Sequence, residues 1–316
     1  MSIEFHCHTL FSIDGSGTPE TLVEAAAERG VEALSITEHN HLGSAARGAA
    51  RAADLGIRYF PGVELNAFFD GCCFDFLGLG IDPDHPALRA VAARNHACYT
   101  ELFNLYFEEM RRLGYPWTRE ELEAFLPVRY PSHPAPVLNT YVIHAYADLR
   151  GGLPGYAAMR EEAQRRISDR RRYSQPGPDE PGRFCTFEAA RDAVHAAGGV
   201  LLLAHIAYQA RDDFAEQSRL IRAMLDAGAD GFEVYHPKNA RFGDIGKLAA
   251  LARDLGCIVS GGSDCHHAPC APPVEIGSCG APAELADRLA AALARQRPGR
   301  GAELQPRDNK ANGWST

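Results

Sequence analysis

The sequence lacks several features that would place it in a familiar class of protein. It has nine cysteines but no Cys-x-x-Cys pair, which argues against a zinc finger and a disulfide framework, so we expect reduced thiols. No apolar run approaches the length of a membrane span. The N-terminus has no basic region followed by a long apolar region. We therefore expect a cytoplasmic protein with neither a secretory signal nor a membrane partner.

An excess of positive charge is also missing. The formal net charge is -9, from 32 Lys and Arg against 41 Asp and Glu. We therefore expect no broad surface for long nucleic acids, although a local positive site around divalent ions is compatible with this balance. The 316 residues are 46% hydrophobic and 23% charged, which suits one large α/β domain or one domain with an insertion. The sequence leaves the oligomeric state open.

Short apolar runs alternate with helical patterns in both halves of the chain. Thr18, Pro19 and Glu20 supply an N-cap, a proline at the first helical position and an acidic first turn. The expected strands cover residues 3–6, 31–36, 57–60, 199–204, 231–235 and 257–260. The expected helices cover residues 18–30, 44–55, 187–197, 214–227, 243–255 and 282–295. Such alternation predicts βαβ units and a parallel sheet.

The alternation stops near residue 71. Residues 72–79 are interpreted as an extended hairpin arm. The sequence from about residue 86 to residue 181 has a helical pattern and is rich in aromatic residues and arginine. It ends in a hinge rich in proline and glycine at residues 175–182. The expected organisation is a discontinuous α/β domain at 1–85 and 183–296, an inserted helical lid for substrate specificity at 86–182, and a polar tail at 297–316.

Histidines and carboxylates gather at the ends of the predicted strands. The clusters are His6-Cys7-His8, Thr37-Glu38-His39-Asn40, Gly62-Val63-Glu64, Leu203-Ala204-His205 and Gly262-Ser263-Asp264-Cys265-His266. Alternate residues of a strand face the same way, so His6 and His8 point to one side. Imidazoles at this spacing suit Zn, Mn or Fe. One such pair alone would indicate ordinary polar residues at a strand end, but the repetition predicts a multinuclear metal site.

Other residues extend this pattern. Asp14 lies in the first loop, where an Asx turn would be the simpler interpretation if it stood alone. Glu64 is taken to end the third strand, where its carboxylate can bridge two cations. Glu38 is expected to orient a ligand histidine as a hydrogen-bond acceptor. Gly261 and Gly262 are expected to let the backbone pass close to a bound ion or substrate.

This ordered set of motifs resembles the PHP family, named for polymerase and histidinol phosphatase domains. The resemblance covers nearly the whole chain and is strongest to the stand-alone phosphoesterase branch, which acts on nucleotides and other phosphorylated metabolites. It implies a distorted, TIM-like (β/α)7 barrel with an inserted helical lid. It also implies two or three divalent metal ions, Mn, Fe or Zn, at the carboxyl ends of the strands.

The resemblance also implies which residues hold each ion. The first ion would use His6, His8, Glu64 and Asp264; the second Glu64, His205 and residue 75; the third Asp14, His39 and His266. Related sequences usually have a histidine where this chain has Asp75. An oxygen ligand would favour Mn, Mg or Fe over Zn at the second ion. Alternatively, the shorter side chain fails to reach and only two ions bind.

Divalent ions in such a cluster activate water and neutralise phosphoryl oxygens. We therefore expect hydrolysis of a phosphate ester of a small metabolite by metal-activated water, since no Gly-x-Ser-x-Gly nucleophile motif is present. His236 ends another strand and would contact phosphate or protonate the leaving oxygen, with a capping role equally open. Arg129 and His133 lie near the place of an Arg-Pro-His lid element in related enzymes. Arg172 precedes the hinge, where the family often has a basic residue able to bind phosphate.

Three alternatives remain at this point. The first is a phosphodiesterase or exonuclease on short oligonucleotides, which the net charge permits. The second is a hydrolase of non-phosphate substrates resembling amidohydrolases, which usually need a bridging lysine. Here Glu64 fills the bridging place, and no lysine precedes Lys238. The third is a regulatory or metal-storage module, which a full ligand set with a lid makes less attractive.

Overall fold

The computed structural model describes residues 2–152, 154–173, 182–266 and 274–296, and of residues 169–173 it describes the backbone alone. The strands are β1 (Ser2–Glu4), β2 (Val31–Leu34), β3 (Arg58–Tyr59), β4 (Gly62–Phe69), β5 (Cys72–Leu79), β6 (Cys185–Thr186), β7 (Val200–Leu203), β8 (Gly231–Tyr235) and β9 (Ile258–Gly261). The helices are α1 (Pro19–Glu28), α2 (Ala45–Asp54), α3 (Pro86–Arg112), α4 (Arg119–Arg129), α5 (Thr140–Leu149), α6 (Tyr156–Tyr173), α7 (Phe187–Ala196), the short 3-10 helix η1 (Ile206–Tyr208), α8 (Phe214–Asp226), α9 (Pro237–Phe242), α10 (Ile245–Leu255) and α11 (Glu284–Gln296). Within these ranges, none of the helices has both the length and the apolar character that a membrane span requires.

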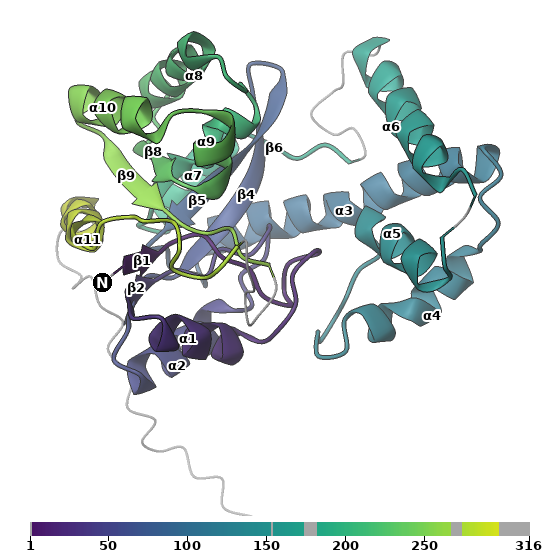
Figure 1. Ribbon diagram of the computed structural model, residues 1–316, viewed down its shortest axis with the longest axis horizontal. Helices are drawn as coiled ribbons and strands as arrows, with labels where there is room; N and C mark the ends of the chain where they lie inside the picture. Colours follow the sequence, from purple (N-terminus) through teal and green to yellow (C-terminus); the bar gives the residue numbers. More distant parts are fainter. Residues whose placement is uncertain (1, 153, 174–181, 267–273, 297–316) are drawn as a thin grey trace, which may run out of the picture.

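The described strands form two sheets (Figure 1). One is parallel, with the order β1-β2-β3, and the other has the order β6-β4-β5-β7-β8-β9. In the larger sheet β5 runs antiparallel to β4 and β7, and the remaining neighbours are parallel. The expected α/β class with parallel pairing is therefore confirmed. A single closed barrel sheet is not what these strands form.

Two isolated bridges link the two sheets close to the ends of β1, β2 and β9. Cys7 pairs in parallel with Cys265, and His39 pairs in parallel with Glu64. The His8 amide donates to the Cys265 carbonyl over 2.8 Å, and the Glu64 amide donates to the Glu38 carbonyl over 3.0 Å. The residues that carry imidazole and carboxylate groups therefore lie where one sheet meets the other.

Local sequence signals explain where several elements begin and end. The Thr18 side chain accepts a hydrogen bond from the Thr21 amide, and Pro19 follows at the start of α1, as the sequence predicts. Helix α10 stops at Gly256, whose φ of 62° is left-handed. Large buried rings such as Phe76, Phe187 and Phe232 then join the larger sheet to its covering helices. Burial of such rings is the main stabilising contribution of the core.

Helices α3 to α6 stand apart from the helices that cover the sheets, on the right of Figure 1. They bury a hydrophobic cluster of their own, which includes Phe103, Tyr115, Leu122 and Val142. Helix α3, with 27 residues, runs from the sheets into this group. We call residues 86–173 the helical segment. The predicted hinge lies outside the described residues except for Gly182, and the predicted tail lies wholly outside them.

Several local predictions are wrong. Glu64 does not end a strand but lies inside β4, an eight-residue strand paired antiparallel with β5 that the strand-helix pattern missed. At Gly262 a Cβ would lie 2.3 Å from the His6 Cβ, so the backbone there passes close to His6. Cys265 is disulfide-bonded, which corrects the expectation of reduced thiols at that position.

Candidate metal centre

Glu64 lies at the middle of the predicted ligands. Its carboxylate is fully buried and faces four imidazoles from three different segments of the chain. Its Oε2 lies 2.9 Å from His39 Nδ1, 3.2 Å from His6 Nε2 and 3.3 Å from His8 Nε2, and its Oε1 lies 3.5 Å from His205 Nε2. The interior of β4 thus projects one carboxylate among histidines that follow β1, β2 and β7.

Two aspartates complete the ring of acids around these imidazoles. Asp264 Oδ1 lies 3.2 Å from His8 Nε2 and 3.5 Å from His6 Nε2. Asp14 Oδ2, on the first loop, lies 3.4 Å from His266 Nε2 and 3.7 Å from His39 Nε2. The loop after β9 and the loop after β1 therefore bring Asp264 and Asp14 to the same place as Glu64.

Ligand atoms lie close enough to hold an ion in three groups. These are His8, His39 and His266; His6, Glu64 and His205; and His6, His236 and Asp264. The groups overlap the ion positions that the family resemblance implies without matching them residue for residue. His236 in particular joins His6 and Asp264, although the sequence had suggested a substrate contact for it.

Buried polar atoms without a partner support a cation at this place. The nitrogens His6 Nε2 and His8 Nε2 and both Glu64 oxygens are buried and have no hydrogen-bond partner among the described residues. Burying such atoms unsatisfied costs free energy, so folded proteins rarely tolerate them without a ligand. Imidazole nitrogens with carboxylate oxygens suit Mn, Fe or Zn. The residues present therefore fit divalent metal ions.

The electrostatics of the site also point to cations. Burial opposes the ionisation of Glu64, yet the imidazoles of His39 and His6 hold the pKa of that carboxyl well below its usual range. Burial likewise opposes a charge on His39, but the Glu64 and Asp14 carboxylates raise the pKa of that imidazole to about 10. In the metal-free protein, the buried carboxylates thus keep histidine protonated. A divalent ion would replace those protons.

Hydrogen bonds behind the histidines fix their tautomers. Ser12 Oγ donates to a Glu38 oxygen over 2.6 Å, so the His8 Nδ1, which lies 3.0 Å from Ser12 Oγ, must be the donor there. His6 Nδ1 lies 3.1 Å from a Glu233 oxygen and donates to it. Both histidines then present the lone pair of Nε2 to the site, as metal ligands require. The prediction that Glu38 orients a ligand is supported through Ser12, whereas Ser12 and Glu233 themselves were missed.

His236 has the opposite tautomer. Its Nδ1 accepts the Lys238 amide hydrogen over 3.0 Å, so the neutral ring carries its hydrogen on Nε2. That Nε2 is buried without a hydrogen-bond partner and lies 3.5 Å from Asp264 Oδ2. An Nε2–H aimed into the site can donate a hydrogen bond, and that nitrogen has no lone pair left for a metal ion.

Lys238 was not predicted as a site residue. Its ammonium lies 2.6 Å from Asp264 Oδ2 and 5.1 Å from the centre of the Tyr208 ring. The side chain is 35% exposed, so it reaches both the buried carboxylate and the opening of the site. The only sequence signal was its place two residues after His236 at a strand end.

Asp75 lies at the edge of the centre. Its Oδ2 is 3.7 Å from His205 Nε2, and its other oxygen accepts a hydrogen bond from the Asn66 side chain. Burial and the nearby Glu64 carboxylate raise its pKa. The aspartate therefore does reach the neighbourhood of His205, with one of its two oxygens already engaged.

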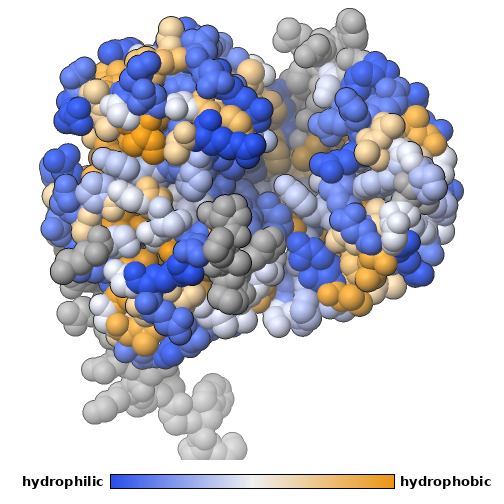
Figure 2. Space-filling view, viewed as in Figure 1, coloured by the Kyte–Doolittle hydropathy of each residue, from blue (hydrophilic) through white to orange (hydrophobic). Residues whose placement is uncertain are grey.

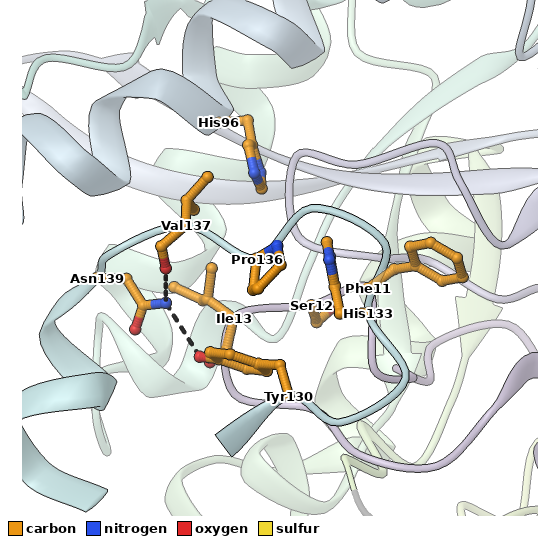
Figure 3. Close-up of a pocket in the computed structure, with 9 residues that line it drawn as sticks. All are labelled: Phe11, Ser12, Ile13, His96, Tyr130, His133, Pro136, Val137 and Asn139. Atoms are coloured by element: carbon orange, nitrogen blue, oxygen red, sulfur yellow. Dashed lines mark hydrogen bonds between the residues drawn. The ribbon is translucent and has the colours of Figure 1, made fainter. Parts of the chain in front are cut away.

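The sequence also singled out Arg129, His133 and Arg172 in and near the helical segment as substrate contacts. His133 borders a small cavity of about 10 Å³ beside Phe11 and Ser12 (Figure 3). The Tyr130 hydroxyl at this cavity donates to the Ile13 carbonyl, next to Asp14. Arg129 stacks over the Tyr130 ring, 4.7 Å from its centre. The side chain of Arg172 lies outside the described residues.

Three residues of the site region have a left-handed backbone that non-glycine residues seldom adopt. The φ angle is 51° at Asn40, 25° at His205 and 58° at Asp264. Such conformations cost about 1–3 kcal/mol each and cluster at functional sites. The chain therefore holds His205 and Asp264 in place at the expense of local stability.

Comparisons with known proteins agree with this geometry. Residues 4–127 match the family model of the PHP domain. The 5'-3' exoribonuclease Rnm of Salmonella typhimurium is 29% identical over 280 residues, covering 87% of each chain. The 3',5'-nucleoside bisphosphate phosphatase of Chromobacterium violaceum is 28% identical over 273 residues, covering 84% of this chain and 87% of the relative.

The fold has a counterpart among solved structures. A Bifidobacterium adolescentis protein described as a metal-dependent phosphoesterase superimposes with a TM-score of 0.70 at 23% identity, covering 92% of this chain and 95% of its own. At that identity the likeness concerns the fold alone. The match shows that residues 4–127 carry a PHP domain, and the relatives that align over most of the chain are hydrolases of phosphoester bonds.

Proposed function

We propose that this protein is a metal-dependent phosphoesterase that hydrolyses a phosphate ester of a small metabolite, such as a nucleotide, a nucleoside phosphate or a sugar or amino-alcohol phosphate. The observation that carries the proposal is the convergence of unpartnered, buried ligand atoms of His6, His8 and Glu64 on one point. Divalent ions bound there would supply Lewis-acid charge and lower the pKa of a bound water.

The side chains around that point have distinct tasks. Glu233 and Ser12 hold His6 and His8 with their Nε2 lone pairs directed inward. The Nε2–H of His236 is placed to donate a hydrogen bond to a phosphoryl or leaving oxygen, since the neutral ring accepts the Lys238 amide hydrogen at Nδ1. Lys238, at the opening, provides a cation for a phosphoryl oxygen.

The number and identity of the ions belong to this proposal. The groups of ligand atoms support two or three ions, with His8, His39 and His266 as one set and His6, Glu64 and His205 as another. We take residues 86–182 as the lid and the remaining sheets and helices as a distorted barrel. The two backbone bridges between the sheets support that description.

A phosphodiesterase acting on short oligonucleotides is the second candidate. The relative from Salmonella typhimurium, a 5'-3' exoribonuclease, favours this candidate. RNA oligonucleotides should therefore be included among the substrates that are tested. The relative from Chromobacterium violaceum, a nucleoside bisphosphate phosphatase, favours the monoester. Both are hydrolases of phosphoester bonds, so the reaction centre is the shared element.

Two measurements test the proposal. Metal analysis of protein purified without chelators should find two or more Mn, Fe or Zn per chain, and fewer than one would contradict a multinuclear site. Release of inorganic phosphate should then be screened over nucleotides, sugar phosphates and amino-alcohol phosphates, and release of mononucleotides over short 5'-phosphorylated oligonucleotides, because diester hydrolysis frees no phosphate. His8→Ala and Asp264→Ala should lose nearly all turnover. Full turnover in both variants would show that the chemistry lies elsewhere.

A further inference from the structure

The side chain of Asn66 determines which oxygen Asp75 presents to the metal centre. The two residues are opposite partners in the pairing of β4 with β5, and the Asn66 side-chain NH2 group donates a hydrogen bond to Asp75 Oδ1. Alternate residues of a strand face the same way, so Asn66 shares a face of β4 with Glu64. The other oxygen, Asp75 Oδ2, is left 3.7 Å from His205 Nε2.

Backbone N–H groups fix the orientation of the side-chain amides around Asn66. The Cys185 amide donates to Asn95 Oδ1 over 2.8 Å. The Asn66 amide donates to Asn40 Oδ1 over 3.1 Å. Because a backbone N–H can only donate, the NH2 groups of Asn95 and Asn40 must lie on the opposite side of each amide. Asn40 Nδ2 then donates to Asn66 Oδ1 over 2.6 Å, which leaves Asn66 Nδ2 to donate to Asp75.

The same hydrogen bonds continue into α3. Asn95 is fully buried there and donates to Asn40 Oδ1 over 2.9 Å. Tyr99, one turn later, is 7% exposed, and its hydroxyl accepts from Asn40 Nδ2 over 2.6 Å. That hydroxyl also donates to Asn66 Oδ1 over 3.1 Å. We call Asn66, Asn40, Asn95 and Tyr99 the hydrogen-bond chain, which runs from α3 to the Asp75 carboxylate.

Helix α3 connects this chain with the helical segment. Asn95 and Tyr99 lie nearer the start of α3, whereas Phe103 and Met110 lie nearer its end and belong to the hydrophobic cluster of the helical segment. The surface is hollowed between that segment and the part of the molecule built on the sheets (Figure 2), and α3 runs from one part to the other (Figure 1). Rigid helices and hydrogen-bond networks of this kind carry energetic coupling between distant parts of a protein.

We propose that Asn66 positions Asp75 for the metal ion near His205, and that the hydrogen-bond chain couples the binding of this ion to α3. The proposal rests on the proposed function, since it concerns an ion of the same site, and it adds a regulation of that ion by the helical segment. Hydrogen-bond partners of a metal ligand fix its orientation, and their loss commonly weakens metal binding about 10- to 100-fold. Coupling is reciprocal, so the ion should order α3 to the extent that α3 strengthens the binding of the ion.

Calorimetric titration of Mn²⁺ into chelator-treated protein measures the positioning without any turnover. The binding step that Asp75→Asn weakens is the step at the ion near His205. Asn66→Ala should weaken that step about 10-fold and leave the other steps within about twofold. Asn104→Ala is the matched control, because it removes an asparagine side chain of α3 that accepts a hydrogen bond from Arg119 and takes no part in the hydrogen-bond chain. Unchanged affinity in Asn66→Ala, or an equal loss in the control, would overturn the proposal.

A double-mutant cycle separates positioning from a structural role. If Asn66 acts through Asp75, then Asn66→Ala should change the Mn²⁺ affinity by less than about twofold in protein that already carries Asp75→Asn. A residue that only supports the fold would weaken binding equally in both backgrounds. Equal losses with and without Asp75→Asn would therefore make Asn66 a structural residue and contradict the positioning role.

Hydrogen exchange tests the link to α3. Saturating Mn²⁺ should slow amide exchange around Asn95 and Tyr99 in the unchanged protein, and it should not do so in Asn66→Ala. Tyr99→Phe removes one neutral hydrogen bond and should weaken the same binding step about 3-fold. Exchange in α3 that does not respond to the metal, or unchanged affinity in Tyr99→Phe, would contradict the coupling. If all these results are as expected but the metal-loaded protein hydrolyses no phosphate ester, the proposed reaction fails and the positioning of Asp75 stands.

Discussion

Lys238 Nζ lies 2.6 Å from Asp264 Oδ2, on the open side of the metal centre. The same carboxylate turns its other oxygen towards His6 and His8. Asp264 therefore lies between the two imidazoles and Lys238. A metal ion bound to Asp264 would share this carboxylate with the ammonium group of Lys238. When a cation binds at Oδ1, Lys238 remains on the side from which a substrate arrives.

Lys238→Met should separate metal binding from turnover. We expect kcat/KM for a phosphate ester to fall about 10- to 100-fold, because a charge contact with the phosphoryl group is worth about 1.5–3 kcal/mol. The metal content should be unchanged or higher, since one competing cation is removed. Steady-state kinetics and metal analysis of the same preparation check this.

A matched control exists for that variant. Lys247 also lies over an aromatic ring, 5.7 Å from the centre of Phe214, but on α10. Lys247→Met should keep the kinetics of the unchanged protein, and Lys238→Arg should keep part of the activity. If Lys238→Met instead lost metal but kept the normal turnover per bound metal, Lys238 would only balance the charge of Asp264 and would not contact the substrate.

Substitutions of Asp75 should alter one ion only. Asp75→His restores the residue that related sequences usually have, and we expect it to raise the preference for Zn over Mn, because nitrogen is the softer ligand. Asp75→Asn should lower the occupancy of the ion near His205 and leave the set of His8, His39 and His266 loaded. Metal titration with competing Zn and Mn measures both effects, and identical stoichiometry and preference in all three proteins would exclude Asp75 as a ligand.

Tyr130→Phe should loosen the loop that carries Asp14. The hydroxyl of Tyr130 is bonded to the Ile13 carbonyl and accepts from the Asn139 side chain over 3.0 Å, so its loss frees both. We expect a loss of about 1–2 kcal/mol in the free energy of unfolding and faster hydrogen exchange in the first loop. Denaturant unfolding and hydrogen exchange check this. Unchanged exchange around Asp14 would show that the loop is held by other contacts.

Acid should weaken the protein through His144. Burial, and then the nearby Arg160, lower the pKa of this imidazole from 6.5 to about 4. Between pH 6.5 and pH 4, His144 is protonated in the unfolded chain but neutral in the folded protein. The free energy of unfolding therefore falls as the pH is lowered from 6.5 to 4. We expect this group to contribute about 1–3 kcal/mol to the fall.

His144→Gln isolates that contribution, because the other titrating groups are the same in both proteins. Its unfolding free energy should depend less steeply on pH over the same window. Parallel curves for the two proteins between pH 4 and 6.5 would mean that His144 titrates normally in the folded state. The measurement should be made on chelator-treated protein so that metal release does not add to the slope.

The sequence pattern alone predicted those helices and strands whose position depends on neighbouring residues. The cap at Thr18 and the strand at residues 231–235 follow from nearest neighbours and apolar periodicity. Long-range pairing was harder to foresee. The short apolar run at residues 57–60 suggested that a strand ends near Glu64. Instead, β4 pairs antiparallel with β5 from Gly62 to Phe69, so Glu64 lies inside a strand.

The convergence of the candidate ligand side chains could be predicted from their spacing in the sequence, but the residues that hydrogen-bond to them could not. Ser12 and Glu233 come from distant segments and meet the histidines only in the folded protein. Lys238 has no motif of its own. The surroundings of His133 could not be predicted either, because its neighbours Phe11 and Ser12 come from a distant loop.

The bridges between the two sheets have a thermodynamic consequence. His6, His8 and His39 follow strands of the small sheet, whereas Glu64 and Asp264 belong to the large one. An ion that binds to both sets would link the two sheets in addition to the backbone hydrogen bonds, the packing and the side-chain hydrogen bonds, such as Ser263 to Glu4 and His6 to Glu233, that already join them. Metal binding and the association of the two sheets would then be thermodynamically coupled. The metal would bind most tightly to protein in which the two sheets are already in contact.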